Sequence, residues 1–308
     1  MRFTVQYPIA QGSYDPAFLD PEVMTRFAQT AERAGFSAIA FTEHPAPSQK
    51  WVDGGGHDAL DPFAALGFCA AVTKRLLLMT HLLVLPYRNP LLAAKGAATV
   101  DVLSGGRLVL GAGSGYLRSE FAALGVDFAE RGELFTEAIE AMRGIWSTEG
   151  FRFTGRHFTA LGQTALPRPV PRPQPDRHPP IWIGGNSVTA RRRVASSAQG
   201  WTPLINDRTA AATTRTALID SPARLAEAVS QLRELTEQAG RDPAAITVQV
   251  ESPDSRAWAD QPDLDQHRQH LGQLAAAGAD WFVVDPPATD VEAGLDALLR
   301  YGEEIARE

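Results

Sequence analysis

The chain has 308 residues, of which 44% are hydrophobic and 21% charged, and its formal net charge is −7. This acidic balance argues against partners such as nucleic acid or an anionic membrane. The sequence contains no uninterrupted run of 18 apolar residues, so we expect no membrane span. The single cysteine, Cys69, excludes a disulfide within the chain and a cysteine metal cluster. Because the first ten residues resemble a strand and not a signal peptide, we expect a cytoplasmic protein.

Strand and helix patterns alternate along the whole chain. The predicted strands are short and apolar on both faces, as in a buried parallel sheet; they cover residues 2–7, 38–42, 76–85, 107–111, 181–183, 200–204, 246–250 and 281–284. The predicted helices cover about 20–35, 61–73, 89–104, 130–147, 187–197, a segment from 221 onward, 267–277 and 291–306. Eight such units predict an α/β fold, a single (β/α)8 barrel domain over residues 1–308.

Long connections interrupt this alternation in three places. Residues 43–60 follow the second strand, and residues 205–220 follow the sixth. The connection after the fourth strand and helix ends in the proline-rich stretch 167–180, whose composition favours extended chain. Loops of this length in a compact domain are usually binding loops or lids, so we expect functional insertions, notably after strands 2 and 4.

Function in a barrel lies where the strands end at their carboxyl side. His44 follows the second strand and can act as a general acid or base near neutral pH, with a structural histidine as the alternative. His81 lies within the third strand, where a buried core histidine is the commoner interpretation. In the loop 43–60, Trp51 is expected to pack within the loop or cover a substrate, and His57 is expected to be exposed.

Two glycine-rich turns are candidates for ligand binding. Residues 111–116 read GAGSGY, which fails the dinucleotide pattern G-x-G-x-x-G because Tyr116 stands where the last glycine belongs. Closely spaced glycines still let backbone approach a flat ring, with a plain tight turn as the alternative. Residues 184–187, GGNS, open a helix whose N–H groups favour a phosphate, unless this is an ordinary capped turn. The run Arg191–Arg193 is interpreted as a solvated helix face or a local anion clamp.

Several strings in chain order are familiar together. They are THE at 42–44, LLVLPYRNP at 82–90, VDVLSGGRLVLGAGSG at 100–115 and PIWIGGN at 180–186. They resemble the luciferase-like monooxygenase family, in particular its branch that uses the deazaflavin coenzyme F420, most strongly over residues 1–205. The resemblance implies a barrel that holds a flavin or deazaflavin ring at its carboxyl-terminal mouth. It also implies a bulge with a non-proline cis peptide behind the ring, near His81-Leu82.

The resemblance also implies roles for individual residues. His44, with Tyr116, would manage the proton that accompanies hydride transfer. In the family's sugar-phosphate dehydrogenase a glutamate occupies the position of Tyr116; Glu120 lies four residues on and is expected to point elsewhere, so a sugar phosphate is not the expected substrate. The cofactor contacts implied by the resemblance come from Glu43, His81, Leu82, Gly113, Ser114, Gly115, Gly184, Gly185 and Asn186.

We therefore predict an oxidoreductase that transfers hydride between F420 and a small organic substrate, and we expect a homodimer without a metal. An FMN-dependent monooxygenase that receives reduced FMN from a separate flavin reductase and uses O2 is the alternative, because both cofactors present a tricyclic ring and a phosphate. A non-catalytic flavin-binding protein is a third hypothesis, against which His44 and the long loop 43–60 count. A barrel lyase or isomerase without a cofactor is the fourth.

Overall fold

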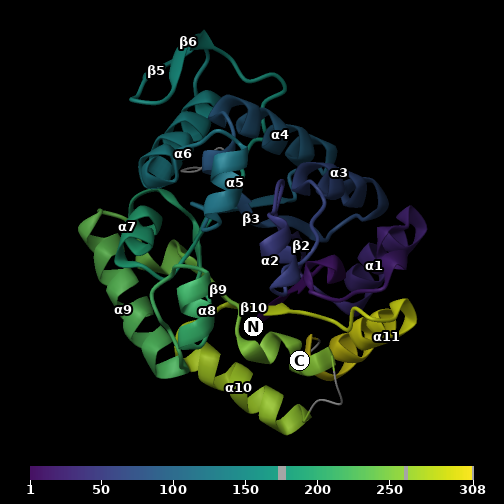
Figure 1. Cartoon of the computed structure of the whole chain (residues 1–308). Coiled ribbons are helices and arrows are strands. Elements are labelled where there is room, and N and C mark those ends of the chain that lie inside the picture. The colour runs from purple at the N-terminus through teal and green to yellow at the C-terminus, as the bar shows by residue number, and fades with distance from the viewer. Residues whose placement is uncertain (173–177, 260–262, 307–308) are drawn as a thin grey trace.

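The computed structural model describes residues 1–172, 178–259 and 263–306, so part of the proline-rich stretch, residues 173–177, lies outside the described residues. Eight parallel strands close into a barrel, each paired with the next and the last with the first (Figure 1). The strands are β1 (Arg2–Gln6), β2 (Ala38–Phe41), β3 (Leu77–Val84), β4 (Leu108–Gly113), β7 (Ile181–Gly184), β8 (Gly200–Thr202), β9 (Thr247–Val250) and β10 (Trp281–Val284). The predicted (β/α)8 barrel is confirmed.

Helices surround the barrel on its outside. They are α1 (Pro21–Ala34), α3 (Pro62–Val72), α4 (Pro90–Leu103), α6 (Arg131–Ser147), α7 (Val188–Ser197), α9 (Pro222–Gln238), α10 (Leu264–Ala276) and α11 (Val291–Tyr301). Their starts follow from local chemistry: Asp20 accepts a hydrogen bond from the N–H of Glu22 at the start of α1, and proline occupies the first helical position. Gly35 ends the same helix in the left-handed conformation that glycine adopts most easily.

The long connections contain elements that the sequence did not predict. Loop 43–60 holds the short helix α2 (Gln49–Asp53), and loop 205–220 holds α8 (Arg208–Thr213). The connection after β4 contains α5 (Arg118–Ala123) and, beyond α6, the antiparallel hairpin β5 (Phe151–Thr154) and β6 (Thr159–Gln163), which projects from the barrel in Figure 1. Helices of five or six residues are too short to show a periodic apolar stripe.

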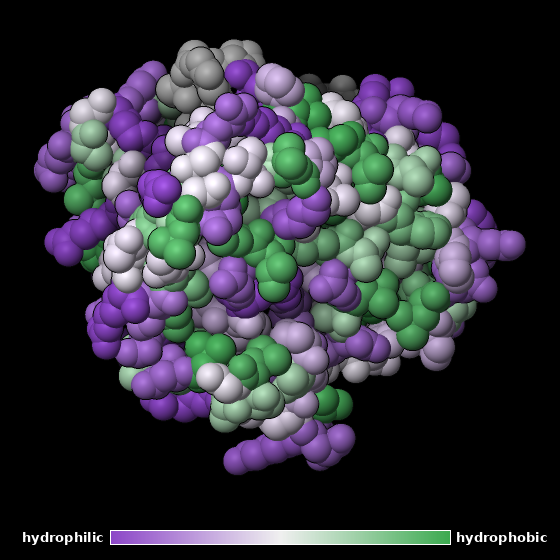
Figure 2. All heavy atoms as spheres, turned by 90° about the horizontal axis from the view of Figure 1, so that it is seen from above, coloured by the Kyte–Doolittle hydropathy of each residue, from purple (hydrophilic) through white to green (hydrophobic). Residues whose placement is uncertain are grey.

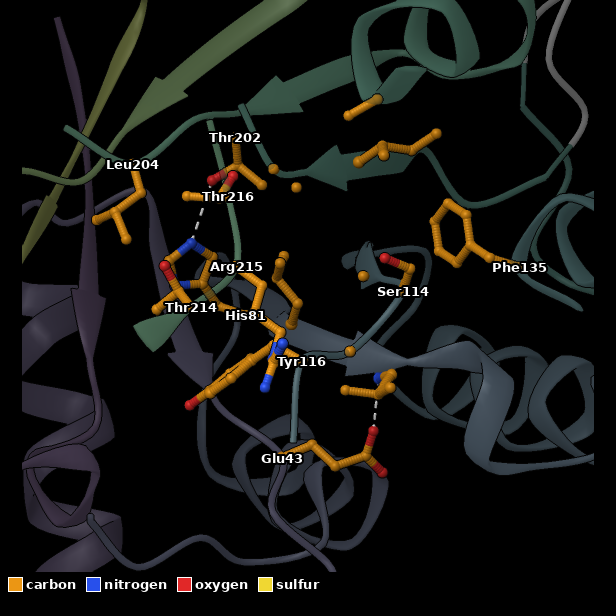
Figure 3. A pocket seen from close by; sticks show the side chains of 18 of the residues that line it. Glu43, His81, Ser114, Tyr116, Phe135, Thr202, Leu204, Thr214, Arg215 and Thr216 are labelled. Carbon is orange, nitrogen blue, oxygen red and sulfur yellow. Dashed lines mark hydrogen bonds between the residues drawn. The ribbon is translucent and has the colours of Figure 1, made fainter. Parts of the chain in front are cut away.

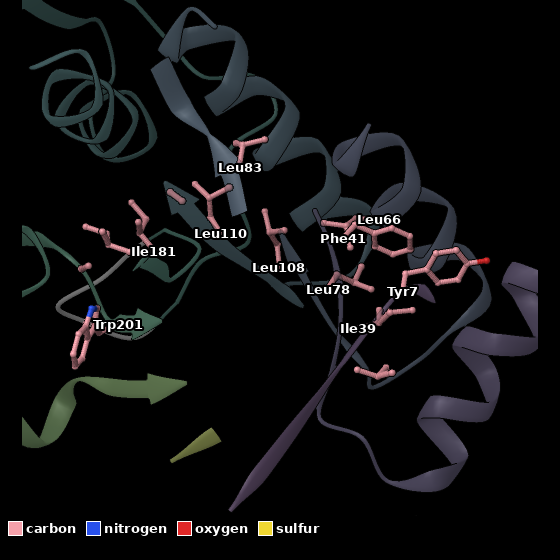
Figure 4. Close-up of a cluster of buried hydrophobic side chains, with 14 of the residues drawn as sticks. Tyr7, Ile39, Phe41, Leu66, Leu78, Leu83, Leu108, Leu110, Ile181 and Trp201 are labelled. Carbon is pink, nitrogen blue, oxygen red and sulfur yellow. The ribbon is translucent and has the colours of Figure 1, made fainter. Parts of the chain in front are cut away.

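The core has two shells. The larger shell lies between strands and helices, where side chains such as Leu78, Leu108 and Ile181 pack outward (Figure 4). The smaller shell fills the barrel interior with Ala38, Ala40, Met79, Val109, Trp182 and Trp281. Because the interior is packed, the barrel offers ligands its open end, not a channel. Within the described residues, no helix combines the length and apolar character that crossing a membrane requires.

Candidate active site

A cavity of about 310 Å³ opens at the carboxyl-terminal ends of the strands (Figure 3). Its lining includes six of the eight strands or the turns directly after them, namely β2, β3, β4, β7, β8 and β9, together with residues of α6, α7 and the loops 43–60 and 205–220. Of the eleven residues predicted from the sequence, ten line it: Glu43, His44, His81, Leu82, Gly113, Ser114, Gly115, Tyr116, Gly184 and Gly185. Asn186 does not. The barrel thus brings together segments that lie about 140 residues apart in the sequence.

Leu82 forms one wall of the cavity. The peptide bond between His81 and Leu82 is cis, as the resemblance implied, and the pairing of β3 with β4 shifts register between Thr80 and Leu83. A Cβ at Gly184 would lie 2.2 Å from Cδ1 of Leu82, and one at Gly113 would lie 3.2 Å from the same atom. These two glycines therefore make room for the Leu82 side chain, a role that the sequence pattern alone did not indicate.

His44 pairs with the carboxylate of Glu120, which was not among the residues predicted for the site. Its Nδ1 lies 3.2 Å from Oε2 of Glu120, and both side chains are less than one-tenth exposed. The Tyr87 hydroxyl donates to the same oxygen at 2.8 Å, and the N–H of Ala46 donates to the other at 3.3 Å. Burial opposes ionisation of Glu120, but these donors outweigh it and hold its pKa below the ordinary value. The expectation that Glu120 points elsewhere was wrong: α5 turns it inward.

Glu43 is a buried support of the wall. Its carboxylate accepts a 2.6 Å hydrogen bond from the N–H of Val84, drawn in Figure 3, and forms an ion pair with Arg88. These contacts fasten the turn after β2 to the end of β3. Glu43 thus fixes the wall of the cavity and is not a free acid.

Aromatic rings cover the His44 side of the cavity. The Trp51 ring lies 4.4 Å from that of His44, and the rings of His57 and Tyr116 lie at 4.9 and 6.0 Å. His57 is half-buried and lines the cavity, which corrects its expected exposure; burial lowers its pKa to about 4. Burial, together with the charge of Glu120, raises the pKa of Tyr116 to about 12. At neutral pH this wall therefore presents a neutral imidazole and a neutral phenol.

His81 also lines the cavity, and its ring lies within a set of hydrogen bonds. Its Nδ1 lies 3.3 Å from Oε1 of Gln6 and its Nε2 lies 3.1 Å from the hydroxyl of Thr202, so Nδ1 donates and Nε2 accepts. Burial lowers its pKa to about 4, and this ring stays neutral at physiological pH. Nearby, burial raises the pKa of Glu251, and burial with the Glu251 charge raises that of Asp285 to about 6. These acids follow β9 and β10.

The turn after β7 forms the other end of the cavity. Ser187 caps α7, and Gly185 has a positive φ of 98°. The Asn186 side chain is committed elsewhere: its Nδ2 donates to the carbonyls of Leu204 and Ala217, and its Oδ1 accepts from the Leu204 N–H. The amide thus holds the loop 203–217 in place, and the cofactor contact expected of Asn186 stays a prediction.

Arginines that the sequence did not single out stand at this end. Arg131, Arg193 and Arg215 line the cavity. Arg191 is buried and donates to the carbonyl of Asn186 at 2.7 Å, so the run Arg191–Arg193 is not a simple solvated face. Within the described ranges no cluster of three or more metal-ligating side chains occurs. The cavity thus has an aromatic, proton-handling side and a basic side.

Comparisons with known proteins bear on the family of this chain. The model of the family described as luciferase-like monooxygenase matches residues 1–275. An FMNH2-dependent dimethylsulfone monooxygenase of Pseudomonas putida is 35% identical over 190 residues, which cover 59% of this chain and 48% of that protein. An F420-dependent glucose-6-phosphate dehydrogenase of Microbacterium testaceum is 30% identical over 185 residues, which cover 59% and 52%. The chain spans about half the length of these two relatives.

A solved structure shows the same fold over the full length. The monooxygenase RslO1 from Streptomyces bottropensis has a TM-score of 0.81, covers 100% of this chain and 99% of its own, and is 20% identical. At that identity the likeness concerns the fold alone. With the family match over residues 1–275, the chain belongs to the luciferase-like monooxygenase family.

Proposed function

We propose that this protein is an oxidoreductase that binds coenzyme F420 in the cavity and transfers hydride between it and a small organic substrate. The observation that carries the proposal is the buried His44–Glu120 pair, whose histidine lines the same cavity as Leu82. A hydrogen-bonded carboxylate fixes the tautomer of a histidine and stabilises its protonated form, as a group that manages one proton requires.

The cavity fits a ring-bearing cofactor. Its wall at Leu82 is apolar, and the turn from Gly184 to Ser187 presents the N-terminal end of a ten-residue helix, where N–H groups and the helix dipole favour a phosphate. Arg193 lines the same end. When bound, the deazaflavin would supply the two-electron hydride chemistry, and the protein supplies orientation and electrostatics.

The protein's own groups then handle the substrate. In the oxidation direction, Nε2 of His44 accepts the proton of a substrate hydroxyl as its carbon loses hydride, and Glu120 stabilises the resulting imidazolium. The neutral Tyr116 hydroxyl donates a hydrogen bond to the substrate oxygen. Trp51 and His57 cover this side and keep water away from the reacting atoms.

One relative favours a second candidate. The 35% identity to an FMNH2-dependent monooxygenase supports a reduced-FMN enzyme that receives its cofactor from a separate reductase and uses O2. The same cavity would serve both cofactors. The experiment that separates them is titration of the purified protein with F420 and with FMN, followed by turnover of candidate alcohols under anaerobic conditions. Anaerobic turnover with F420 supports the proposal, whereas a strict need for O2 and reduced FMN supports the alternative.

We propose further that two chains associate through α3 and α4. The helix α3 has no polar side chain although it lies outside the barrel, and a helix of that kind is normally buried. The helix α4 is apolar except for Lys95, Thr99 and Asp101. Ala64 and Ala71 on α3 are exposed, and on α4 the exposed fractions of Leu92 and Leu103 are 71% and 65%. Figure 2 views the side that carries α4 and shows hydrophobic atoms over a broad part of it. A second copy would cover this apolar surface.

A further inference from the structure

Four arginine side chains gather at the basic end of the cavity. Arg118 begins α5, Arg131 begins α6, Arg193 lies on α7 and Arg215 lies in the loop after α8. Three of them surround one ring: the guanidinium carbons of Arg131, Arg118 and Arg215 lie 3.9, 4.3 and 5.7 Å from the centre of Phe128. Each of these guanidinium groups therefore lies against the face or edge of a buried apolar ring.

These arginines have no acidic partner within residues 1–172, 178–259 and 263–306. Arg131 donates to the carbonyl of Phe128, and Arg193 donates to the Thr136 hydroxyl and the Gly132 carbonyl, all of them neutral acceptors. Burial and the charges of Arg118 and Arg215 lower the pKa of Arg131, which shows that the guanidinium groups repel one another. Like charges gathered in this way repel one another and disfavour the fold. In a chain of net charge −7, such a cluster therefore indicates a binding site for an anion.

The backbone at Arg215 has an uncommon conformation. Its φ is 53°, the left-handed region that few non-glycine residues adopt and that clusters at functional sites. The neighbouring Thr216 hydroxyl accepts the N–H of Asn186, which ties this loop to the turn after β7. Figure 3 shows the Arg215 side chain extending into the cavity.

The charge exceeds what one phosphate needs. A phosphate at the Gly184–Ser187 turn carries at most two negative charges, whereas the four guanidinium groups carry four positive ones. Arg118 does not line the cavity and lies further out, on the exposed surface. The cluster therefore leads from the phosphate turn toward solvent.

We propose that Arg118, Arg131 and Arg215 form a second anion subsite, which binds acidic groups linked beyond the phosphate of the cofactor. This inference rests on the proposed function, because F420 continues past its phosphodiester into a tail of glutamyl carboxylates, whereas FMN ends at its phosphate. The subsite would select the deazaflavin by its tail, while the ring wall at Leu82 accepts either ring. Exposed guanidinium–carboxylate pairs are individually weak, so two or three of them give roughly a tenfold gain in affinity at low salt.

The test compares two forms of F420, one with its glutamyl tail and one cut after the phosphodiester, by ring fluorescence with the full chain. The wild-type protein is expected to bind the tailed form about tenfold more tightly in low salt, and the preference is expected to shrink as salt screens exposed charges. The double variant Arg118→Gln with Arg215→Gln is expected to lose the preference and to bind the cut form as the wild type does. Arg192→Gln, an exposed arginine of the same helix as Arg193, is the control that should change neither.

Each outcome decides a different point. Equal affinity of the wild type for both forms, or an equal loss for both forms in the double variant, overturns the tail subsite and leaves the F420 assignment intact. Binding of neither form overturns the F420 assignment and the subsite together. A thermal melt of each variant excludes misfolding, and Arg215→Lys, which keeps the charge, should restore most of the preference.

Discussion

Nδ1 of His44 lies 3.2 Å from Oε2 of Glu120, and this contact joins the turn after β2 to the helix after β4. The bond leaves Nε2 as the ring nitrogen available to a ligand in the cavity. It also places an ionised carboxylate directly behind the group proposed to take up a proton. The proton chemistry of the site is therefore a property of a pair of residues, 76 positions apart in the sequence.

Glu120→Gln keeps the shape of the side chain and removes its charge. We expect kcat to fall roughly 10- to 100-fold, less than the roughly 100- to 10,000-fold loss expected for His44→Asn, because Glu120 acts through the histidine. The cofactor Kd should stay unchanged, and the pH dependence of kcat should shift. Tyr87→Phe, which removes one donor to the same oxygen but leaves the charge, is the matched control. A loss of cofactor binding equal to the loss of kcat would show that Glu120 is only structural.

Gly184→Ala should weaken cofactor binding through Leu82. The added Cβ would lie 2.2 Å from Cδ1 of Leu82, so that side chain must rotate. Overpacking of this kind costs about 1 to 3 kcal/mol, which corresponds to a rise in Kd of roughly 5- to 150-fold. Gly272→Ala, at a helical position of α10 where a Cβ meets nothing within 4 Å, should leave the Kd unchanged. Unchanged binding by the Gly184 variant would mean that Leu82 does not contact the ring.

Asp285→Asn should stabilise the protein above pH 6. The folded protein keeps the Asp285 proton up to about pH 6, whereas the unfolded chain loses it near pH 4, so stability falls as pH rises between these values. The variant removes this loss. Its free energy of unfolding should exceed that of the wild type by roughly 1 to 3 kcal/mol at pH 8, with little difference near pH 4.

Urea unfolding of both proteins at the two pH values measures the difference. The contact from Nε of Arg256 can be kept, since the amide oxygen also accepts. His81 titrates in the same acidic range, but it is present in both proteins, so its contribution to stability largely cancels in the difference. A variant that is less stable than the wild type at pH 8 would show that the Asp285 charge is well compensated.

Leu92→Glu should disrupt the proposed dimer. Leu92 is 71% exposed on α4, and a charge there would be buried against the second copy. Light scattering should give twice the mass of the chain for the wild type and a lower mass for the variant at micromolar concentration. Leu299→Glu, at a half-exposed leucine of α11 on another side of the barrel, should leave the mass unchanged. If the wild type has the mass of a single chain at all concentrations, the proposed dimer is contradicted.

The barrel was predictable because its signals are local and repeated. Asp-Pro and Asn-Pro pairs mark helix starts, and apolar runs of four to eight residues mark buried strands. The family resemblance added the cis bond at His81-Leu82, which no local pattern encodes. Ten of the eleven predicted site residues line one cavity.

The parts that were missed depend on tertiary contacts. Glu120 lies on a six-residue helix, and only the fold shows that this helix turns its acid toward His44. Arg131, Arg193 and Arg215 come from three segments that span 84 residues and share no motif. Asn186 fits a phosphate turn by composition, yet its amide pairs with Leu204 and Ala217, which lie far along the chain.

The measurement that tests the central claim most directly is a titration of the purified protein with F420 and, separately, with FMN, in which ring fluorescence reports binding. We predict saturable binding of F420 with a Kd in the micromolar range or below, about −8 kcal/mol or more favourable, and FMN binding at least tenfold weaker. Tight binding of FMN with no binding of F420 would contradict this account and would identify the cavity as the site of a reduced-FMN monooxygenase.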